Sequence, residues 1–167
     1  MTTVQNSLRD HIREAKTEKH ANQTRWHQIL THGIHLGVCA GRTALPEPMD
    51  VYTPNSLLDN SRRPNTPVYH VPDGVCGFAW VQMSAVKGTE GQEARKFINW
   101  LTGTQAPCDA WLAPPVRCDK SYGGGHSIWI SDHNQSMQRK SAHADALSAY
   151  LRENIAGLSA YTSTRID

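Results

Sequence analysis

The stretch GGGHSIWISDHNQSMQRKSAHADALSAYLREN, residues 123–154, places a turn, a strand and a helix in immediate succession. Three glycines tolerate the backbone angles of a turn, and the residues of HSIWIS, 126–131, then alternate as in a strand. Apolar residues spaced by three and four follow, which predicts a helix with Asn134 or Ser136 as its N-cap and Gly157 as its end.

The same succession occurs upstream. Residues 71–86, VPDGVCGFAWVQMSAV, are apolar and β-prone, so we expect a strand at 75–84 that is buried on both faces. A helical period follows over 89–103, and residues 158–167 predict a third strand. We therefore predict an α+β fold in which two helices cover a small sheet of about three strands in β-α-β-α-β order. The predicted core is Val75, Phe78, Val81, Phe97, Ile98, Leu101, Ile128, Ile130, Leu147 and Leu151.

The chain divides into three parts by composition. Residues 1–40 predict an N-terminal helical segment. Over residues 1–20, Val4, Leu8, Ile12 and Ala15 are spaced to form one narrow buried face. Residues 24–36 repeat the pattern, and Gly33 and Gly37 are expected to end that helix. Residues 41–67 are rich in proline and predict an extended arm without regular helix or strand. Residues 68–167 form the compact α+β domain.

The overall composition restricts the classes of protein. A net charge of +2 is too balanced to indicate a nucleic-acid or membrane surface. No apolar run approaches the ~20 residues of a membrane span, and the N-terminal residues lack the apolar centre of a signal peptide. The cysteines have no CxxC spacing, so we expect free thiols, with the state of Cys108 and Cys118 left open.

One candidate catalytic pair is Cys76 with His126, because a cysteine nucleophile needs an imidazole within hydrogen-bond reach. Asp132, His133 or Asn134 could orient the histidine. Such a cysteine usually opens a helix, whereas this one lies in a predicted strand. We therefore expect Cys76 to be a small packed residue and His126 a strand residue without a catalytic role, and a Cys–His hydrolase remains the alternative.

Metal and cofactor sites have weaker signals. His32, His35 and Cys39 are spaced to share one face of a helix, but a structural zinc site needs four ligands. The glycines at 123–125 precede a strand rather than a helix, so they do not form a phosphate-binding loop. We expect no metal and no cofactor.

Nucleic-acid binding is a further alternative. Five aromatic residues could stack on bases: Trp80, Trp100, Trp111, Trp129 and Tyr122. We expect Trp80 and Trp129, which lie on predicted strands, to belong to the core. Arg62, Arg63, Arg139 and Lys140 could meet phosphates, but the last two are expected on a solvated helix face.

Two segments carry a resemblance. YGGGHSIWISDHNQSMQRKSAHADALSAYLRE contains the patterns GGxxIW and QSxxRKxA, and AYTSTRID closes the chain on R[IL]D. Through these residues, and through PDGVCGFAWV, the chain resembles a group of small proteins encoded by bacteriophages, over roughly residues 68–167. No activity is established for the group, so the resemblance assigns no catalytic residue. It implies a viral setting, in the host cytoplasm or the virion.

The expected function is non-enzymatic. A long irregular arm buries little surface by itself and gains order when it lies against another surface. We therefore expect protein–protein interaction or self-assembly, as a virion component or as an accessory factor in the infected cell.

Overall fold

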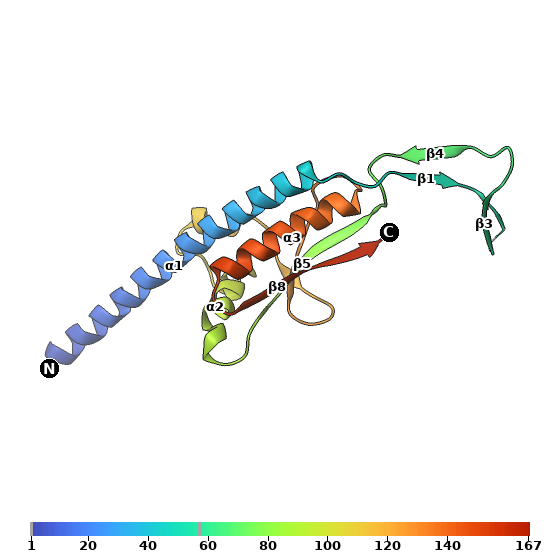
Figure 1. The fold of residues 1–167 in the computed structure, drawn as a ribbon. Helices are drawn as coiled ribbons and strands as arrows, with labels where there is room; N and C mark the ends of the chain where they lie inside the picture. Colours follow the sequence, from blue (N-terminus) through green and yellow to red (C-terminus); the bar gives the residue numbers. More distant parts are fainter. Residues whose placement is uncertain (1, 57) are drawn as a thin grey trace.

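The computed structural model describes residues 2–56 and 58–167, with side chains for residues 8–56, 58 and 61–167. Over these residues the fold is a mixture of helices and small antiparallel sheets, which confirms the predicted α+β class. Figure 1 follows the chain from a long helix, through a projecting ribbon, into a sheet with two further helices.

Three helices occur in the described part of the chain: α1 (Thr2–Thr43), α2 (Gln92–Leu101) and α3 (Met137–Asn154). Short 3-10 turns lie at Thr89–Gly91 and Ala110–Leu112. The strands are β1 (Met49–Tyr52), β2 (Pro54–Ser56), β3 (Asp59–Arg62), β4 (Val68–Val71), β5 (Gly77–Ala85), β6 (Asp119–Lys120), β7 (His126–Trp129) and β8 (Leu158–Ile166).

The body of the molecule is built on a four-stranded antiparallel sheet in the order β6-β7-β5-β8. β5 is central: it pairs along its whole length with β8, and its residues 80–83 pair with residues 126–129 of β7. The short strand β6 extends the predicted sheet of about three strands by one edge strand.

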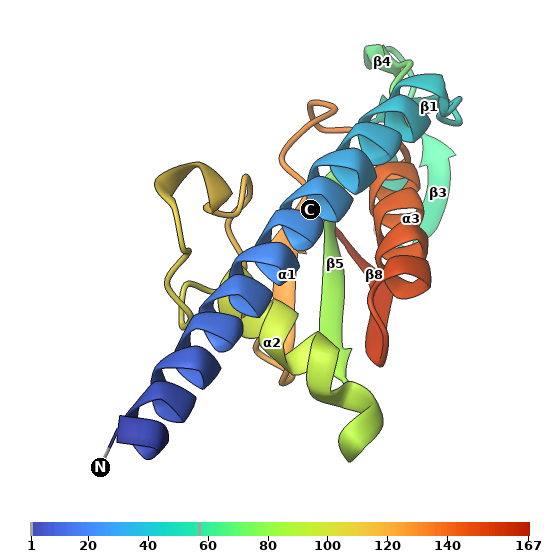
Figure 2. The ribbon, with the colours of Figure 1, turned by 90° about the vertical axis from the view of Figure 1, so that its left-hand side faces the viewer.

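The helices cover one face of this sheet. α3 packs on β5 and β8, α2 packs on β5, and the C-terminal half of α1 lies alongside α3 (Figures 1 and 2). Trp26 and Leu30 of α1 share one hydrophobic core with Phe97 of α2, Leu147 of α3 and Val81 of β5. The predicted core is confirmed at eight positions, Val81, Phe97, Ile98, Leu101, Ile128, Ile130, Leu147 and Leu151, and is wrong at two, Val75 and Phe78, which are half-buried.

The prediction that the strand near 75–84 is buried on both faces is also wrong. The side chains of β5 alternate between buried and half-buried over Gly77–Met83, so the strand is covered on one face and open on the other. The sequence suggested burial on both faces because the open side carries Phe78 and Trp80, which are as apolar as core residues.

α1 is one continuous helix, so the prediction that Gly33 and Gly37 end it is wrong. These glycines and Gly41 recur every four residues and form a seam against α3 and the turn before it. A Cβ atom at Gly37 would lie 2.2 Å from the His143 ring and 3.0 Å from the His143 carbonyl oxygen. The glycines are therefore needed for close helix approach rather than for helix termination.

The N-terminal half of α1 extends past the body (Figure 1). Residues 8–18 are all exposed, and Leu8 and Ile12, expected on a narrow buried face, are 61% and 49% exposed. The chain does not cover the apolar stripe on this part of the helix.

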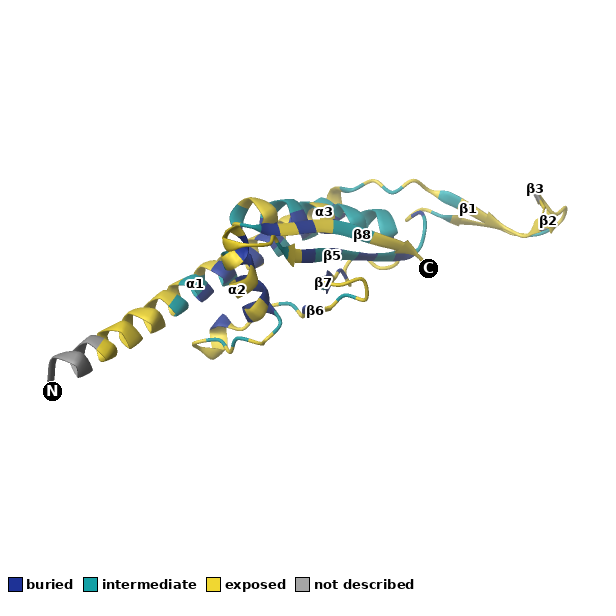
Figure 3. Ribbon diagram, turned by 90° about the horizontal axis from the view of Figure 1, so that it is seen from below, coloured by how far each residue is buried: buried dark blue, intermediate teal, exposed yellow. Residues whose placement is uncertain are grey.

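The arm also differs from prediction. Residues 41–67 contain the last turn of α1 and the strands β1, β2 and β3, so the expectation of no regular structure is wrong. β1 pairs with β4 and β2 with β3, and the ribbon projects from the end of the body opposite the N-terminus (Figures 1 and 3). The prolines lie at strand ends and turns, where the missing N–H does not break a ladder bond.

Candidate functional site

The arm is a two-stranded ribbon that exposes apolar side chains. In the β1–β4 register, Val51 faces Tyr69 and Tyr52 faces Val68. Val51 is 43% exposed and Tyr69 is 64% exposed. A two-stranded ribbon is only marginally stable alone in water. Burying these exposed apolar side chains against another surface would therefore stabilise the ribbon.

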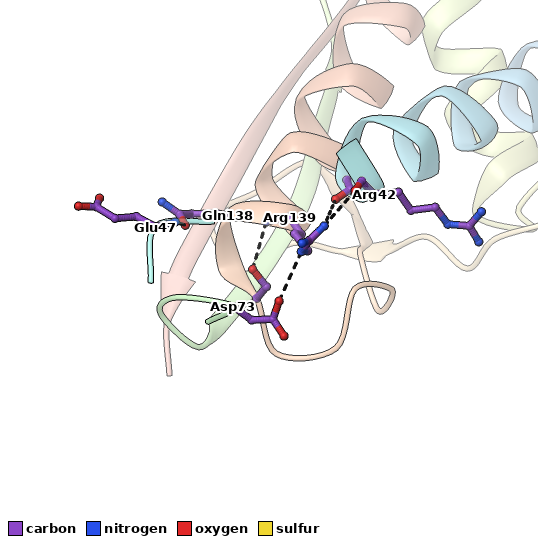
Figure 4. Close-up of polar contacts among 7 residues, drawn as sticks. Arg42, Glu47, Asp73, Gln138 and Arg139 are labelled. Atoms are coloured by element: carbon purple, nitrogen blue, oxygen red, sulfur yellow. Dashed lines mark hydrogen bonds and ion pairs between the residues drawn. The ribbon is translucent and has the colours of Figure 1, made fainter. Parts of the chain in front are cut away.

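The ribbon is anchored to the first turn of α3 (Figure 4). Arg139 donates hydrogen bonds to the carbonyl oxygens of Gly41, at 3.3 Å, and Arg42, at 3.0 Å, and its Nε lies 3.6 Å from an Asp73 carboxylate oxygen. The outgoing chain is held by Glu47, whose backbone N–H donates to the Gln138 side chain at 2.6 Å. One helix start thus holds the end of α1 and both ends of the arm.

A glycine tightens this anchor. Gly74 has a φ of +70°, and a Cβ atom there would lie 2.6 Å from the Glu47 carbonyl oxygen. The backbones of the outgoing and returning ends of the arm therefore lie in close contact at Glu47 and Gly74. This contact fixes the direction in which the ribbon leaves the body.

Lys140, the residue after Arg139, is buried. It is 4% exposed, donates to the Gly77 carbonyl oxygen at 3.1 Å, and its Nζ lies 5.6 Å from the centre of the Phe78 ring. The expectation that Arg139 and Lys140 form a solvated helix face is therefore wrong, because both side chains hold other segments of the chain.

Two histidines form a polar pair beneath α1. The Nε2 atom of His133 lies 3.1 Å from Nδ1 of His143, and His143 is 2% exposed. Burial, and then the nearby His133, lowers the pKa of His143 to about 4, and burial also lowers the pKa of His133. Both rings are neutral near pH 7, so the N–H of one ring donates to the unprotonated nitrogen of the other.

The open face of the sheet gathers aromatic and polar side chains. Directly paired residues share a face, so Phe78, Trp80 and Gln82 of β5 lie beside Trp129 of β7 and Tyr161 of β8. The Phe78 and Trp80 rings are 5.9 Å apart, and Trp129 and Tyr161 are 56% and 57% exposed. The expectation that Trp80 and Trp129 belong to the core is wrong.

A shallow hollow of about 400 Å³ lies on this face. It is lined by Trp80, Tyr122, Lys120 and Arg165, together with serine and threonine residues. Tyr122, on the loop between β6 and β7, is fully exposed, and the Arg165 guanidinium lies 5.4 Å from the centre of the Phe78 ring.

The candidate catalytic residues are not brought together. Cys76 comes immediately before β5, whereas His126 pairs with Met83 near the far end of that strand. The seven steps from 76 to 83 span roughly 23 Å of extended chain at about 3.3 Å per residue. Asp132 follows β7, beside the histidine pair. The geometry supplies no nucleophile–base pair for the hydrolase alternative.

The candidate metal ligands are spread along α1. The Cys39 sulfur lies 3.7 Å from Nε2 of His35, while His32 packs on the Tyr150 ring at 5.1 Å. Within the described residues, no group of three or more histidine, cysteine or acidic side chains is arranged to hold a metal ion.

The four cysteines are free thiols. Cys108 is exposed, and burial, with the nearby Asp119 charge, raises the pKa of Cys118 to about 12. These two thiols are not linked to each other.

The five candidate binding residues lie in three places: Arg62 and Arg63 near the tip of the arm, Arg139 and Lys140 at its anchor, and Tyr122 beside the open sheet face. Sequence reasoning missed Gln138 and Asp73 at the anchor, since neither has a local signal. The signal for the open face was present, because alternation in β5 and β7 places their tryptophans on the same side.

No protein-family model, curated protein or solved structure matches this chain. None of its described helices is both long enough and apolar enough to cross a membrane.

Proposed function

We propose that this is a non-enzymatic protein that acts through protein–protein contact, with the arm as its docking element. The observation that supports this most directly is the projecting β1–β4 ribbon, whose apolar side chains lie outside the hydrophobic core. A strand or loop of another protein could extend either edge of the ribbon or cover one of its faces.

The anchor supports the same proposal. Arg139, Gln138 and Asp73 hold the base of the arm at several points, so the ribbon leaves the body in a fixed direction. A fixed direction lowers the entropy lost when a partner binds.

The setting is part of the proposal. The resemblance of residues 68–167 to bacteriophage-encoded proteins favours a virion component or an accessory factor in the host cytoplasm. A second copy of the chain is one partner that would satisfy the proposal, through self-assembly.

Site-specific crosslinking tests the proposal. A photoreactive amino acid replaces Tyr69 in the full chain, and a matched protein carries it at Trp111, which is similarly exposed at 61% but lies outside the arm. We expect covalent adducts with a defined protein at position 69 and not at 111, and we expect Val51→Ser, on the same ribbon face, to reduce them.

The adduct mass separates a second copy from a different protein. No adduct at position 69, or the same adducts at both positions, would show that the arm is not the docking element.

A further inference from the structure

The open face of the sheet has a composition that differs from both the core and the arm. Its members, identified by strand register, are aromatic, hydroxyl, amide or charged. None of its described residues on β5, β7 and β8 is aliphatic, although these strands place Ala79, Val81, Ile128 and Leu158 on the other face. These members are Phe78, Trp80, Gln82, Ser84, Ser127, Trp129, Ser159, Tyr161, Ser163 and Arg165, together with Asp119 of β6 opposite Ser127.

A surface of this kind fits a ligand with flat rings and polar edges. Where this sheet packs against the helices of its own chain, it presents aliphatic side chains such as Ala79, Val81 and Ile128. Aromatic rings that are half exposed instead offer flat surfaces for stacking, and the neighbouring serines supply hydrogen-bond donors and acceptors.

The charge on this face favours an anion. Lys120 and Arg165 line the hollow, and among the described residues that line it none is acidic. Arg165 belongs to the open face by register, whereas Lys120, which pairs with His126, lines the hollow from the edge strand β6. The register also places Asp119 of β6 on this face, but its carboxylate is 2.9 Å from Nε of Arg117, which offsets its charge. The ligand should therefore combine stacking rings with negative charge.

We propose that the open sheet face binds single-stranded nucleic acid, with bases stacked on Trp80, Trp129 and Tyr122 and phosphates next to Lys120 and Arg165. Single strands expose both the faces of their bases and their phosphates, whereas a duplex hides the base faces. This surface is separate from the arm, so the proposal goes beyond protein–protein contact and does not depend on it.

Fluorescence anisotropy of the full chain with labelled oligothymidylate and oligouridylate of about 20 nucleotides tests the proposal. We expect both single strands to bind more tightly than a duplex of the same length. The ratio of the affinities for oligothymidylate and oligouridylate shows whether DNA or RNA is the preferred ligand. Combining Trp129→Ala with Tyr122→Ala should weaken binding by about tenfold or more. Trp111→Ala is the matched control, an equally exposed tryptophan away from this face, and should leave binding unchanged.

A salt titration tests the phosphate contacts. Each lost phosphate contact on a single strand should reduce the slope of log K against log salt by about 0.7. Lys120→Ala with Arg165→Ala should therefore reduce it by about 1.4, while Arg9→Ala with Lys16→Ala, on the projecting end of α1, should not.

Amide and indole NMR spectra locate the contact without any variant. We expect the Trp80 and Trp129 indole signals to shift on addition of oligothymidylate, while those of the buried Trp26 and Trp100 stay in place. The proposal is overturned by the absence of binding to either single strand, by equal affinity for the duplex, or by equal loss of affinity in the Trp111→Ala control. It is also overturned if Trp129→Ala dissociates a dimer, since a second copy would then be the occupant of this face.

Discussion

The two faces of the central sheet differ in chemistry although their residues alternate along the same strands. Toward the helices, β5 presents Ala79, Val81 and Met83, none more than 2% exposed. Away from them it presents Phe78 and Trp80, which are half-buried. Hydrophobicity alone does not separate the two faces, but side-chain type does: aliphatic residues fill the covered face and aromatic residues occupy the open one.

The largest expected effect comes from emptying the covered face. Phe97→Ala removes a fully buried ring of α2 and should lower the free energy of unfolding by about 3–5 kcal/mol. Trp129→Ala removes a larger ring from the open face and should cost less than about 1 kcal/mol. Urea unfolding of both variants measures the difference, and equal losses would show that the open face contributes to the core.

Acid should weaken the covering layer through His143. The unfolded chain takes up a proton at the ordinary pKa of 6.5, whereas the folded chain resists protonation until about pH 4. The stabilisation is therefore complete above pH 6.5, is lost as the pH falls toward 4, and amounts to about 3 kcal/mol.

The measurement is the free energy of unfolding between pH 7 and 4 for the wild type and for His143→Gln, in which this part of the pH dependence should disappear. His70→Gln is the control, because that histidine pairs with Asp50 on the exposed arm. An unchanged slope in His143→Gln would mean that the His133–His143 pair is not closed as the structure has it.

Glycine substitutions compare the covering layer with the loop beside the open face. Gly37→Ala would force a methyl group into the His143 ring and should cost about 1–2 kcal/mol, because overpacking exceeds the gain in helix propensity. Gly123 has nothing within 4 Å of an added Cβ, so Gly123→Ala should change stability by less than about 0.5 kcal/mol. Thermal unfolding of the pair checks this, and a stabilised Gly37→Ala protein would contradict the tight seam between α1 and α3.

A contrast of similar size concerns the two cations beside Phe78. Lys140→Met leaves the Gly77 carbonyl oxygen without its donor in a buried place and should cost about 1–3 kcal/mol. Arg165→Met, on the exposed side, should cost less than about 1 kcal/mol. Chemical denaturation of both variants measures the contrast, and a larger loss for Arg165→Met would reverse the assignment of the covered and open sides.

Periodicity predicted the elements of the body well. Strands near 75–84 and 126–131, the helix after Ser136 and the closing strand all occur, with ends shifted by a few residues. Of the two candidate N-caps, Asn134 and Ser136, the structure has Ser136, which accepts a hydrogen bond from the Arg139 backbone N–H. The candidate sites were predicted less well, because a site depends on which distant segments meet.

The missed features share a physical cause. A glycine in a helical pattern can end the helix or let another helix approach, and only the position of His143, far along the chain, shows that Gly37 does the second. Similarly, Arg139 has the local signature of a solvated helix residue, yet its guanidinium holds the Gly41 carbonyl oxygen 98 residues away.

Local sequence patterns specify the mixed α+β character, the main strands and helices of the body apart from the edge strand β6, and the side-chain alternation that produces two unlike sheet faces. These properties depend on neighbours within a few residues, where propensity, capping and period act. Three features depend on the folded arrangement of distant segments: which sheet face the helices cover, the continuation of α1 through its glycines, and the direction of the arm. Those outcomes depend on burial and hydrogen bonds between segments that come together only when the whole chain is folded.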